Sequence, residues 1–288
     1  MKQWQFINLA LLAMLVVLGV NQAMADDNAP PLRVLSIGGA VTEIVYALEM
    51  EHLLIGRDTT SNFPPEVTEL PDVGYMRALS PEGVLAIAPD LIIAVEGAGP
   101  PETIDVLNNA GIAFVTIPEG FDGAALRAKV AAVAQALGVS DRGAILAEQI
   151  NGELQAASDS IGPDAPRVLF ILSMQNGRVM ASGSGTAADA IITMAGGQNA
   201  FTAFEGYLPV TDEAVLAAAP DVILMMDRMG DHAMEDADLF AHPALSTTPA
   251  AQQGQVIRMD GLFLLGFGPR TPQAVADLAR AFAELGQS

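Results

Sequence analysis

Tyr75 and Arg77 are the residues of this chain whose types and spacing point most directly to chemistry. They stand in the segment Gly74-Tyr75-Met76-Arg77, between a Pro-rich turn and a helix-like run at residues 80–88. A free phenol has a pKa of about 10 in water, and a neighbouring guanidinium favours its phenolate form. Because a phenolate is a hard anionic oxygen suited to ferric iron, the pair predicts a site for a ferric porphyrin. The alternative from residue types alone is a half-buried packing tyrosine beside solvated arginines.

The first 25 residues have the order of a secretory signal. Lys2 precedes a short apolar run at residues 9–20, and Ala23-Met24-Ala25 then leads into Asp26-Asp27. This order predicts cleavage after Ala25, and the apolar run is shorter than the roughly 20 residues of a membrane-spanning anchor, which is the alternative. The chain has no Cys, so disulfides, thiolate metal sites and a lipidated cysteine are excluded. We therefore expect an unanchored protein of a Gram-negative periplasm.

Composition narrows the class of partner. The formal net charge is −21, with 51% hydrophobic and only 16% charged residues, over 288 residues. The hydrophobic share is that of a folded protein, and the length suits two lobes. The acidic balance disfavours nucleic acid and anionic lipid as partners, and favours a basic partner surface.

Hydrophobic patterning predicts an α/β fold with two Rossmann-like lobes. Apolar runs at residues 33–37, 91–95 and 113–117 alternate with helical segments, as expected for a mostly parallel sheet, and give a first lobe at residues 32–120. Residues 121–160 lack Pro and repeat apolar side chains at helical spacing, which predicts a long helical connector. Strand-like runs resume at residues 167–172 and give a second lobe at residues 166–288.

An internal repeat relates the two lobes. Residues 79–93 align without gaps on residues 210–224, with 8 of 15 positions identical, including the Ala-Pro-Asp that enters a strand in each copy. A Gly-Tyr pair lies upstream of both copies, as Gly74-Tyr75 and Gly206-Tyr207. We interpret the repeat as one helix-turn-strand unit per lobe.

Several motifs resemble one family. The chain is similar to the helical-backbone periplasmic substrate-binding proteins of the vitamin B12 and iron-siderophore type, and within them to the haem-binding branch that serves a haem ABC importer. The motifs that carry the resemblance are the repeated Ala-Pro-Asp, Ser36-Ile37-Gly38-Gly39, Asp58-Thr59-Thr60-Ser61, Gly74-Tyr75-Met76-Arg77 and Gly268-Pro269-Arg270-Thr271-Pro272.

The resemblance implies a role for individual residues. By similarity, Tyr75 is the axial ligand of a haem iron, Arg77 is its hydrogen-bonding partner, and Arg228 is a contact from the second lobe. Glu43 and Glu205 would dock onto arginines of a membrane permease. Haem would then be the transported ligand of a monomeric carrier rather than a catalytic cofactor.

Residue positions add independent support and leave some alternatives open. Arg228 follows the strand-like run 222–226, and open α/β sheets place ligands at the carboxyl ends of parallel strands. His232 lies four residues later, where a solvated loop histidine is favoured over a second iron ligand. The chain has no G-x-S-x-G, H-E-x-x-H or P-loop, which disfavours a periplasmic hydrolase. A ferric-siderophore or cobalamin carrier is the closer alternative.

Overall fold

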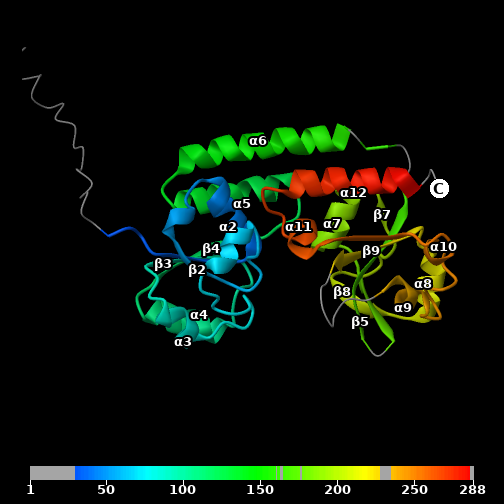
Figure 1. Ribbon diagram of the computed structural model, residues 1–288, viewed down its shortest axis with the longest axis horizontal. Coiled ribbons are helices and arrows are strands. Elements are labelled where there is room, and N and C mark those ends of the chain that lie inside the picture. The colour runs from blue at the N-terminus through cyan, green and yellow to red at the C-terminus, as the bar shows by residue number, and fades with distance from the viewer. Residues whose placement is uncertain (1–29, 160, 163–164, 176, 228–234, 286–288) are drawn as a thin grey trace, which may run out of the picture. The chain divides into compact units, whose positions relative to one another are not determined.

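The structure is a computed structural model that describes residues 30–285 apart from 160, 163–164, 176 and 228–234 (Figure 1). The expected export signal lies outside these residues, as do Arg228 and His232. The described residues from Leu32 onward belong to one compact unit. This unit contains two α/β lobes and a helical connector, as the sequence predicts.

The first lobe is built on a parallel four-stranded sheet. Side chains of its strands alternate between two apolar cores, so that Val34 and Ile93 pack on one face while Leu35 and Ile92 pack on the other. Burial on both faces explains why these strands are nearly continuous apolar runs. The strands are β1 (Val34–Ile37), β2 (Leu54–Arg57), β3 (Leu91–Val95) and β4 (Ala113–Ile117). Their order in the sheet is β2-β1-β3-β4.

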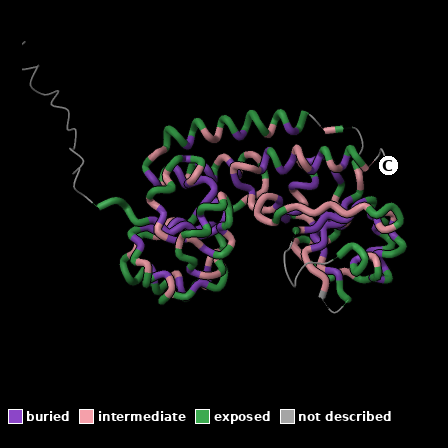
Figure 2. Tube along the Cα trace, viewed as in Figure 1, coloured by how far each residue is buried: buried purple, intermediate pink, exposed green. Residues whose placement is uncertain are grey.

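Short helices cover both faces of this sheet (Figure 2). Val41 and Ile44 of the first helix enter one core, while Val84 and Leu107 of the next two enter the other. The elements are α2 (Gly39–Ala47), α3 (Pro81–Ala86), α4 (Pro101–Asn109), and the 3₁₀ turns η1 (Glu51–Leu53) and η2 (Pro65–Glu69). Ser80 caps α3 by accepting a hydrogen bond from the Gly83 N–H at 3.2 Å.

The connector consists of two helices, α5 (Gly123–Ala136) and α6 (Ser140–Asp159). They turn at Gly138, whose φ of 72° is the left-handed conformation that glycine adopts without strain. α5 packs on the first lobe, and α6 packs both on α5 and on the last helix of the second lobe (Figure 1). Ile150 and Ala157 of α6 enter the cores of different lobes, so the connector ties the two lobes together.

The second lobe contains a mixed sheet in which parallel pairs outnumber antiparallel ones. The central strand pairs in parallel on one side and antiparallel on the other, where the chain returns through a hairpin. The strands are β5 (Arg167–Gln175), β6 (Arg178–Ser182), β7 (Gln198–Asn199), β8 (Tyr207–Val210), β9 (Val222–Asp227) and β10 (Val256–Asp260). The main order is β10-β9-β5-β6-β8, and β7 pairs with β5.

Helices again pack on both faces of this sheet. The last and longest, α12, buries Val275, Leu278 and Phe282 against the core. The others are α7 (Ala187–Met194), α8 (Asp212–Ala218), α9 (Asp236–Phe240), α10 (Pro249–Gln252) and α11 (Gly261–Leu265), with α12 at Thr271–Leu285. Within the described part of the chain, no helix has the length and apolar character needed to cross a membrane.

Candidate ligand-binding site

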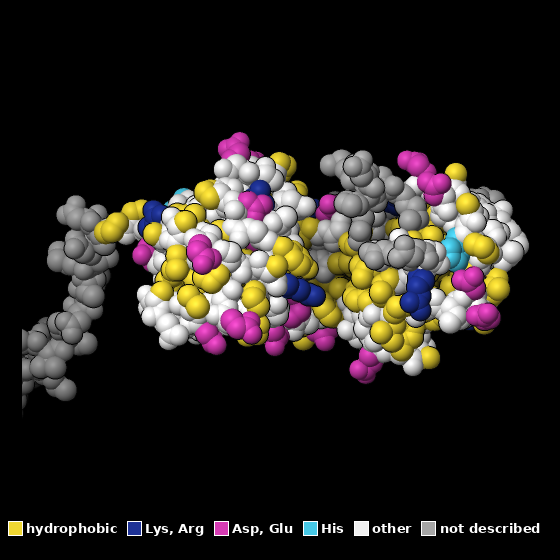
Figure 3. Space-filling model, turned by 90° about the horizontal axis from the view of Figure 1, so that it is seen from below, with side chains coloured by type: hydrophobic (Ala, Val, Ile, Leu, Met, Phe, Trp, Pro, Cys, Tyr) yellow, Lys and Arg dark blue, Asp and Glu magenta, His cyan; other side chains and the backbone are white. Residues whose placement is uncertain are grey.

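A cavity of about 730 Å³ opens between the two lobes. Its volume falls within the range of about 300 to 1,000 Å³ that is common for small-ligand sites. Both lobes supply its walls: Gly38, Glu96 and Glu119 follow β1, β3 and β4, while Gly261 follows β10. The carboxyl ends of parallel strands therefore surround the cavity, which is the usual ligand position in open α/β sheets. In Figure 3, hydrophobic side chains gather along the junction of the lobes.

Tyr75 lies at this cavity in a loop that backbone hydrogen bonds hold in place. The Gly74 carbonyl accepts from the Thr59 N–H at 3.0 Å, and the Gly74 N–H donates to the Asp72 carboxylate at 2.8 Å. Gly74 has a φ of 96°, which only glycine adopts readily. The Tyr75 side chain is 48% exposed and lines the cavity. The loop thus presents the phenol to any molecule that enters.

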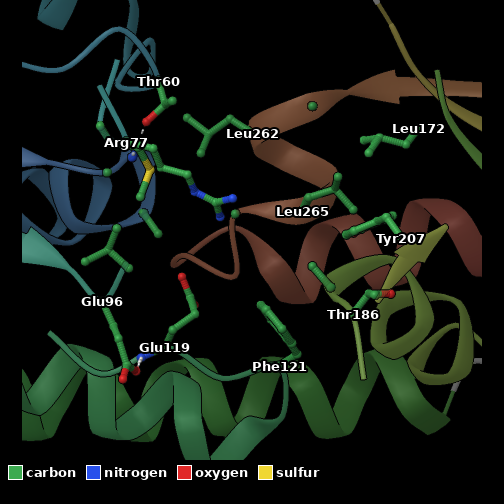
Figure 4. Close-up of a pocket in the computed structure, with 18 of the residues that line it drawn as sticks. Thr60, Arg77, Glu96, Glu119, Phe121, Leu172, Thr186, Tyr207, Leu262 and Leu265 are labelled. Atoms are coloured by element: carbon green, nitrogen blue, oxygen red, sulfur yellow. Dashed lines mark hydrogen bonds between the residues drawn. The ribbon is translucent and has the colours of Figure 1, made fainter. Parts of the chain in front are cut away.

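Arg77 extends from the same loop into the cavity (Figure 4). Within the described part of the chain, it is the only Lys or Arg that lines the cavity, and it forms no ion pair. No hydrogen bond joins it to Tyr75. It lies instead close enough to Tyr207 of the second lobe to lower the pKa of that phenol. Its guanidinium therefore extends into the cavity rather than along its own loop.

Tyr207 is a cavity residue that the sequence analysis did not select. It is the first residue of β8 and lines the cavity from the second lobe. Its ring packs against that of Phe170, with 6.2 Å between the ring centres. Burial raises its pKa, and this effect outweighs the hydrogen bonds that the Thr186 hydroxyl and the Ala188 N–H donate to it. The repeated Gly-Tyr pair was the sequence signal that could have identified it.

The segment Asp58-Thr59-Thr60-Ser61 shapes a wall of the cavity from behind. Asp58 is fully buried, and its carboxylate accepts from the Gly38 N–H at 2.8 Å, the Thr60 N–H at 3.0 Å and the Ser61 hydroxyl at 2.7 Å. These bonds fix the glycine turn that opens α2, where Gly38, Gly39 and Ala40 line the cavity. The motif therefore positions this turn, and its Thr60 itself lines the cavity.

Glu43, which the family resemblance implies as a docking residue, is buried in the structure. Its side chain is 5% exposed and lies in the second turn of α2, where two hydrogen bonds from Arg270 hold the carboxylate. Burial raises the pKa of Glu43, and Arg270 opposes this by stabilising the carboxylate. A carboxylate enclosed in this way cannot meet a partner without breaking an internal ion pair. Glu205, in contrast, is exposed in the loop before β8, where its backbone pairs with that of Ser184 in an isolated parallel β-bridge.

Comparison with known proteins assigns the chain to a family. Residues 34–261 match the model of the periplasmic binding protein family. The chain belongs to this family. Among solved structures, it is 42% identical to the periplasmic haem-binding protein BhuT in complex with two haems, with a TM-score of 0.85, covering 89% of this chain and 99% of that one.

Curated relatives of this periplasmic binding protein have other names. A vitamin B12-binding protein of Pectobacterium atrosepticum is 29% identical, over 89% of this chain and 90% of its own length. An uncharacterised ABC transporter substrate-binding lipoprotein of Bacillus subtilis is 25% identical, over 87% and 80%. The protein is therefore a substrate-binding protein of an ABC importer, and its relatives are binding proteins rather than enzymes.

The cavity of this periplasmic binding protein combines polar and apolar side chains. Among the described residues, no group of three or more His, Cys, Asp or Glu is placed to hold a metal ion. The cavity is lined by two phenols, one guanidinium, the side chains of Glu96 and Glu119, and apolar side chains such as Leu262 and Leu265. Such a wall can pack against a flat aromatic ligand and contact it with few polar groups.

Proposed function

We propose that this periplasmic binding protein captures haem, as ferric protoporphyrin, between its lobes and delivers it to an ABC permease. The observation that carries the proposal is the Tyr75 phenol, which is 48% exposed at the wall of an interlobe cavity. Tyrosinate is an established axial ligand of ferric haem iron. The 42% identity to a haem-binding protein supports the same ligand. Capture would take place in the periplasm after removal of the export signal.

Arg77 supplies the charge that such a ligand needs. Haem propionates are anionic, and a guanidinium binds a carboxylate through paired, charge-assisted hydrogen bonds. Arg77 has no ion pair within the described part of the chain, so its guanidinium is available to a ligand. Arg228, just beyond the end of β9, is proposed as a second cationic contact and lies outside the described residues.

The proposal is tested by titrating the purified protein with ferric haem. We expect one saturable transition with a Soret band and the high-spin features of ferric phenolate ligation. Cyanocobalamin and a ferric siderophore, added as competitors, distinguish haem from the alternatives that the B12-binding relative supports. An unchanged haem spectrum on addition of protein would refute the proposal. Displacement of haem by a stoichiometric amount of cobalamin would show that the transported ligand is the corrinoid.

Tyr207 favours a second haem in the same cavity. It lies in the second lobe, in a Gly-Tyr pair just upstream of one repeat copy, as Tyr75 lies in the Gly-Tyr pair upstream of the other, and both phenols line the cavity. Because burial raises its pKa, the phenol is neutral in the empty protein and would ionise on binding iron. The structural relative that holds two haems supports this stoichiometry. A titration endpoint of two haems per chain, reduced to one in Tyr207→Phe, is the expected result.

For docking to the permease, we propose exposed carboxylates in each lobe. Glu82 and Glu213 occupy identical places in the repeat, in the first turns of α3 and α8, and both are exposed. Hydrogen bonds from its own backbone N–H and then from a capping hydroxyl lower the pKa of each, so both are ionised near neutral pH. These two negative charges are complementary to a basic partner surface. Glu205, next to the cavity wall of the second lobe, adds a third.

A further inference from the structure

Glu96 and Glu119 place two carboxylates on one wall of the cavity. They follow the neighbouring strands β3 and β4, which pair in register at Val95 and Ile117. The Glu119 N–H donates a hydrogen bond to the Glu96 carboxylate at 3.2 Å. Figure 4 shows both residues beside the connector helices, whereas Arg77 enters the cavity from a different side. The cavity therefore has an acidic wall.

A buried lysine neutralises only one of these carboxylates. Lys129 of α5 is fully buried, and its ammonium donates to Glu119 at 2.6 Å and to the Phe267 carbonyl at 3.2 Å. Since Glu96 has no ion pair among the described residues, the wall retains about one negative charge. The Lys129 pair also holds Glu119 in position, because moving its carboxylate would leave a buried ammonium without its counter-charge.

We infer that Glu96 and Glu119 determine which tetrapyrroles enter the cavity, and in which orientation. This inference rests on the proposed function. A carboxylate of the ligand that approached this wall would meet like charge, while one that approached Arg77 would meet a guanidinium. Protoporphyrin carries its two propionates on one edge and can satisfy both conditions. A porphyrin with carboxylates on every edge must place at least one against the acidic wall.

The cavity would select among porphyrins both by attracting carboxylates to Arg77 and by repelling them from Glu96. Arg77 alone would attract any porphyrin that has a carboxylate, so it does not discriminate between a two-carboxylate and a four-carboxylate ligand. A fixed charge on the opposite edge of the ligand does discriminate, because specificity is a difference between two affinities. Glu96 thus acts as a specificity-determining residue that contacts the edge of the ligand bearing no propionates.

The test compares ferric protoporphyrin IX with ferric coproporphyrin III, which has four propionates. We expect the parent protein to bind protoporphyrin more tightly than coproporphyrin. In Glu96→Gln, the ratio of the two affinities should fall by about threefold to tenfold, because coproporphyrin binds more tightly. The matched control is Glu148→Gln, which removes the same charge from an exposed position on α6 outside the cavity and should leave the preference unchanged.

The outcomes separate the inference from the function on which it rests. If both porphyrins bind and the ratio of their affinities is the same in the parent and in Glu96→Gln, the inference is wrong and the haem proposal stands. A parent protein that binds neither porphyrin would overturn both. Equal narrowing by Glu148→Gln would show that net charge, rather than the cavity wall, sets the preference, and would also overturn the inference.

Discussion

Glu43 of the first lobe and Arg270 of the second form a nearly enclosed ion pair across 227 positions of sequence. The guanidinium donates to the two carboxylate oxygens at 3.1 and 2.6 Å, and it also lies 3.6 Å from the ring centre of Phe63. A planar guanidinium suits both contacts, because its edge donates to two carboxylate oxygens while its face stacks on an aromatic ring. The pair therefore fixes α2 of one lobe against the segment that leads into α12 of the other.

Breaking this pair on one side should be costly, whereas replacing both sides should not. Glu43→Ala leaves Arg270 without its counter-charge, and we expect the free energy of unfolding to fall by about 2 to 3 kcal/mol, below the value for a wholly buried pair because Arg270 is 22% exposed. The double variant Glu43→Met with Arg270→Met should lose less than about 1 kcal/mol. Urea denaturation measures both, and equal losses would show that the pair is not the source of the effect.

The same pair predicts a pH dependence of stability. Burial raises the pKa of Glu43, so the folded protein holds this proton more tightly than the unfolded chain. The associated stability is fully present below the usual glutamate pKa and is lost as pH rises through the raised value. Relative to Glu43→Gln, which does not titrate, the parent should therefore lose stability from about pH 4.5 upward. A constant difference between the two proteins across this window would contradict the shift.

Tyr75→Phe tests the iron ligand. The substitution removes the phenolate oxygen but keeps the ring, so we expect affinity for the haem held by Tyr75 to fall more than about tenfold and the phenolate charge-transfer absorption to weaken, leaving only the part due to Tyr207. Tyr46→Phe is the matched control, since Tyr46 lies on α2 and does not line the cavity. An unchanged absorption spectrum in Tyr75→Phe would assign the ligand to another residue.

Arg77→Gln tests whether the guanidinium of Arg77 lies close enough to Tyr207 to lower the pKa of that phenol. Arg77 is one of the groups that lower the pKa of Tyr207, so its removal should raise that pKa further above its usual value. Ultraviolet titration of the ligand-free protein detects phenol ionisation, and the chain has only three tyrosines. Tyr207→Phe identifies the transition that belongs to Tyr207. No shift of that transition in Arg77→Gln would mean that the two side chains lie far apart in solution.

Permease docking is tested with surface carboxylates that leave the cavity intact. The double variant Glu82→Gln with Glu213→Gln should bind haem like the parent but transfer it more slowly to a reconstituted importer, and Glu205→Gln should act in the same direction. Individual exposed pairs contribute only about 0 to 1 kcal/mol, but their match governs encounter and register. Added salt should slow transfer by the parent, because it screens these charges. Parental transfer rates in the double variant would remove these residues from the interface.

Local sequence patterns determined most of the elements. Residues 91–95 and 113–117 form strands as predicted because each is a parallel strand covered on both faces, which requires a continuous apolar run. The helical connector followed from apolar spacing, and Gly138 ends its first helix because the turn needs a positive φ. β2 was missed because Gly56 and Arg57 interrupt its apolar pattern.

Tertiary structure decided which of the chemically suitable residues meet. The Gly-Tyr repeat is visible in the sequence, yet only the packing of the two lobes brings Tyr207 to the cavity of Tyr75 and within electrostatic reach of Arg77. Glu43 has the sequence pattern of an exposed helix-start carboxylate, but α2 turns it inward to Arg270. Spacing along the chain reports on neighbours within a few residues, whereas these contacts join segments more than a hundred residues apart. Their energies arise from burial and charge pairing that exist only once the lobes have packed together.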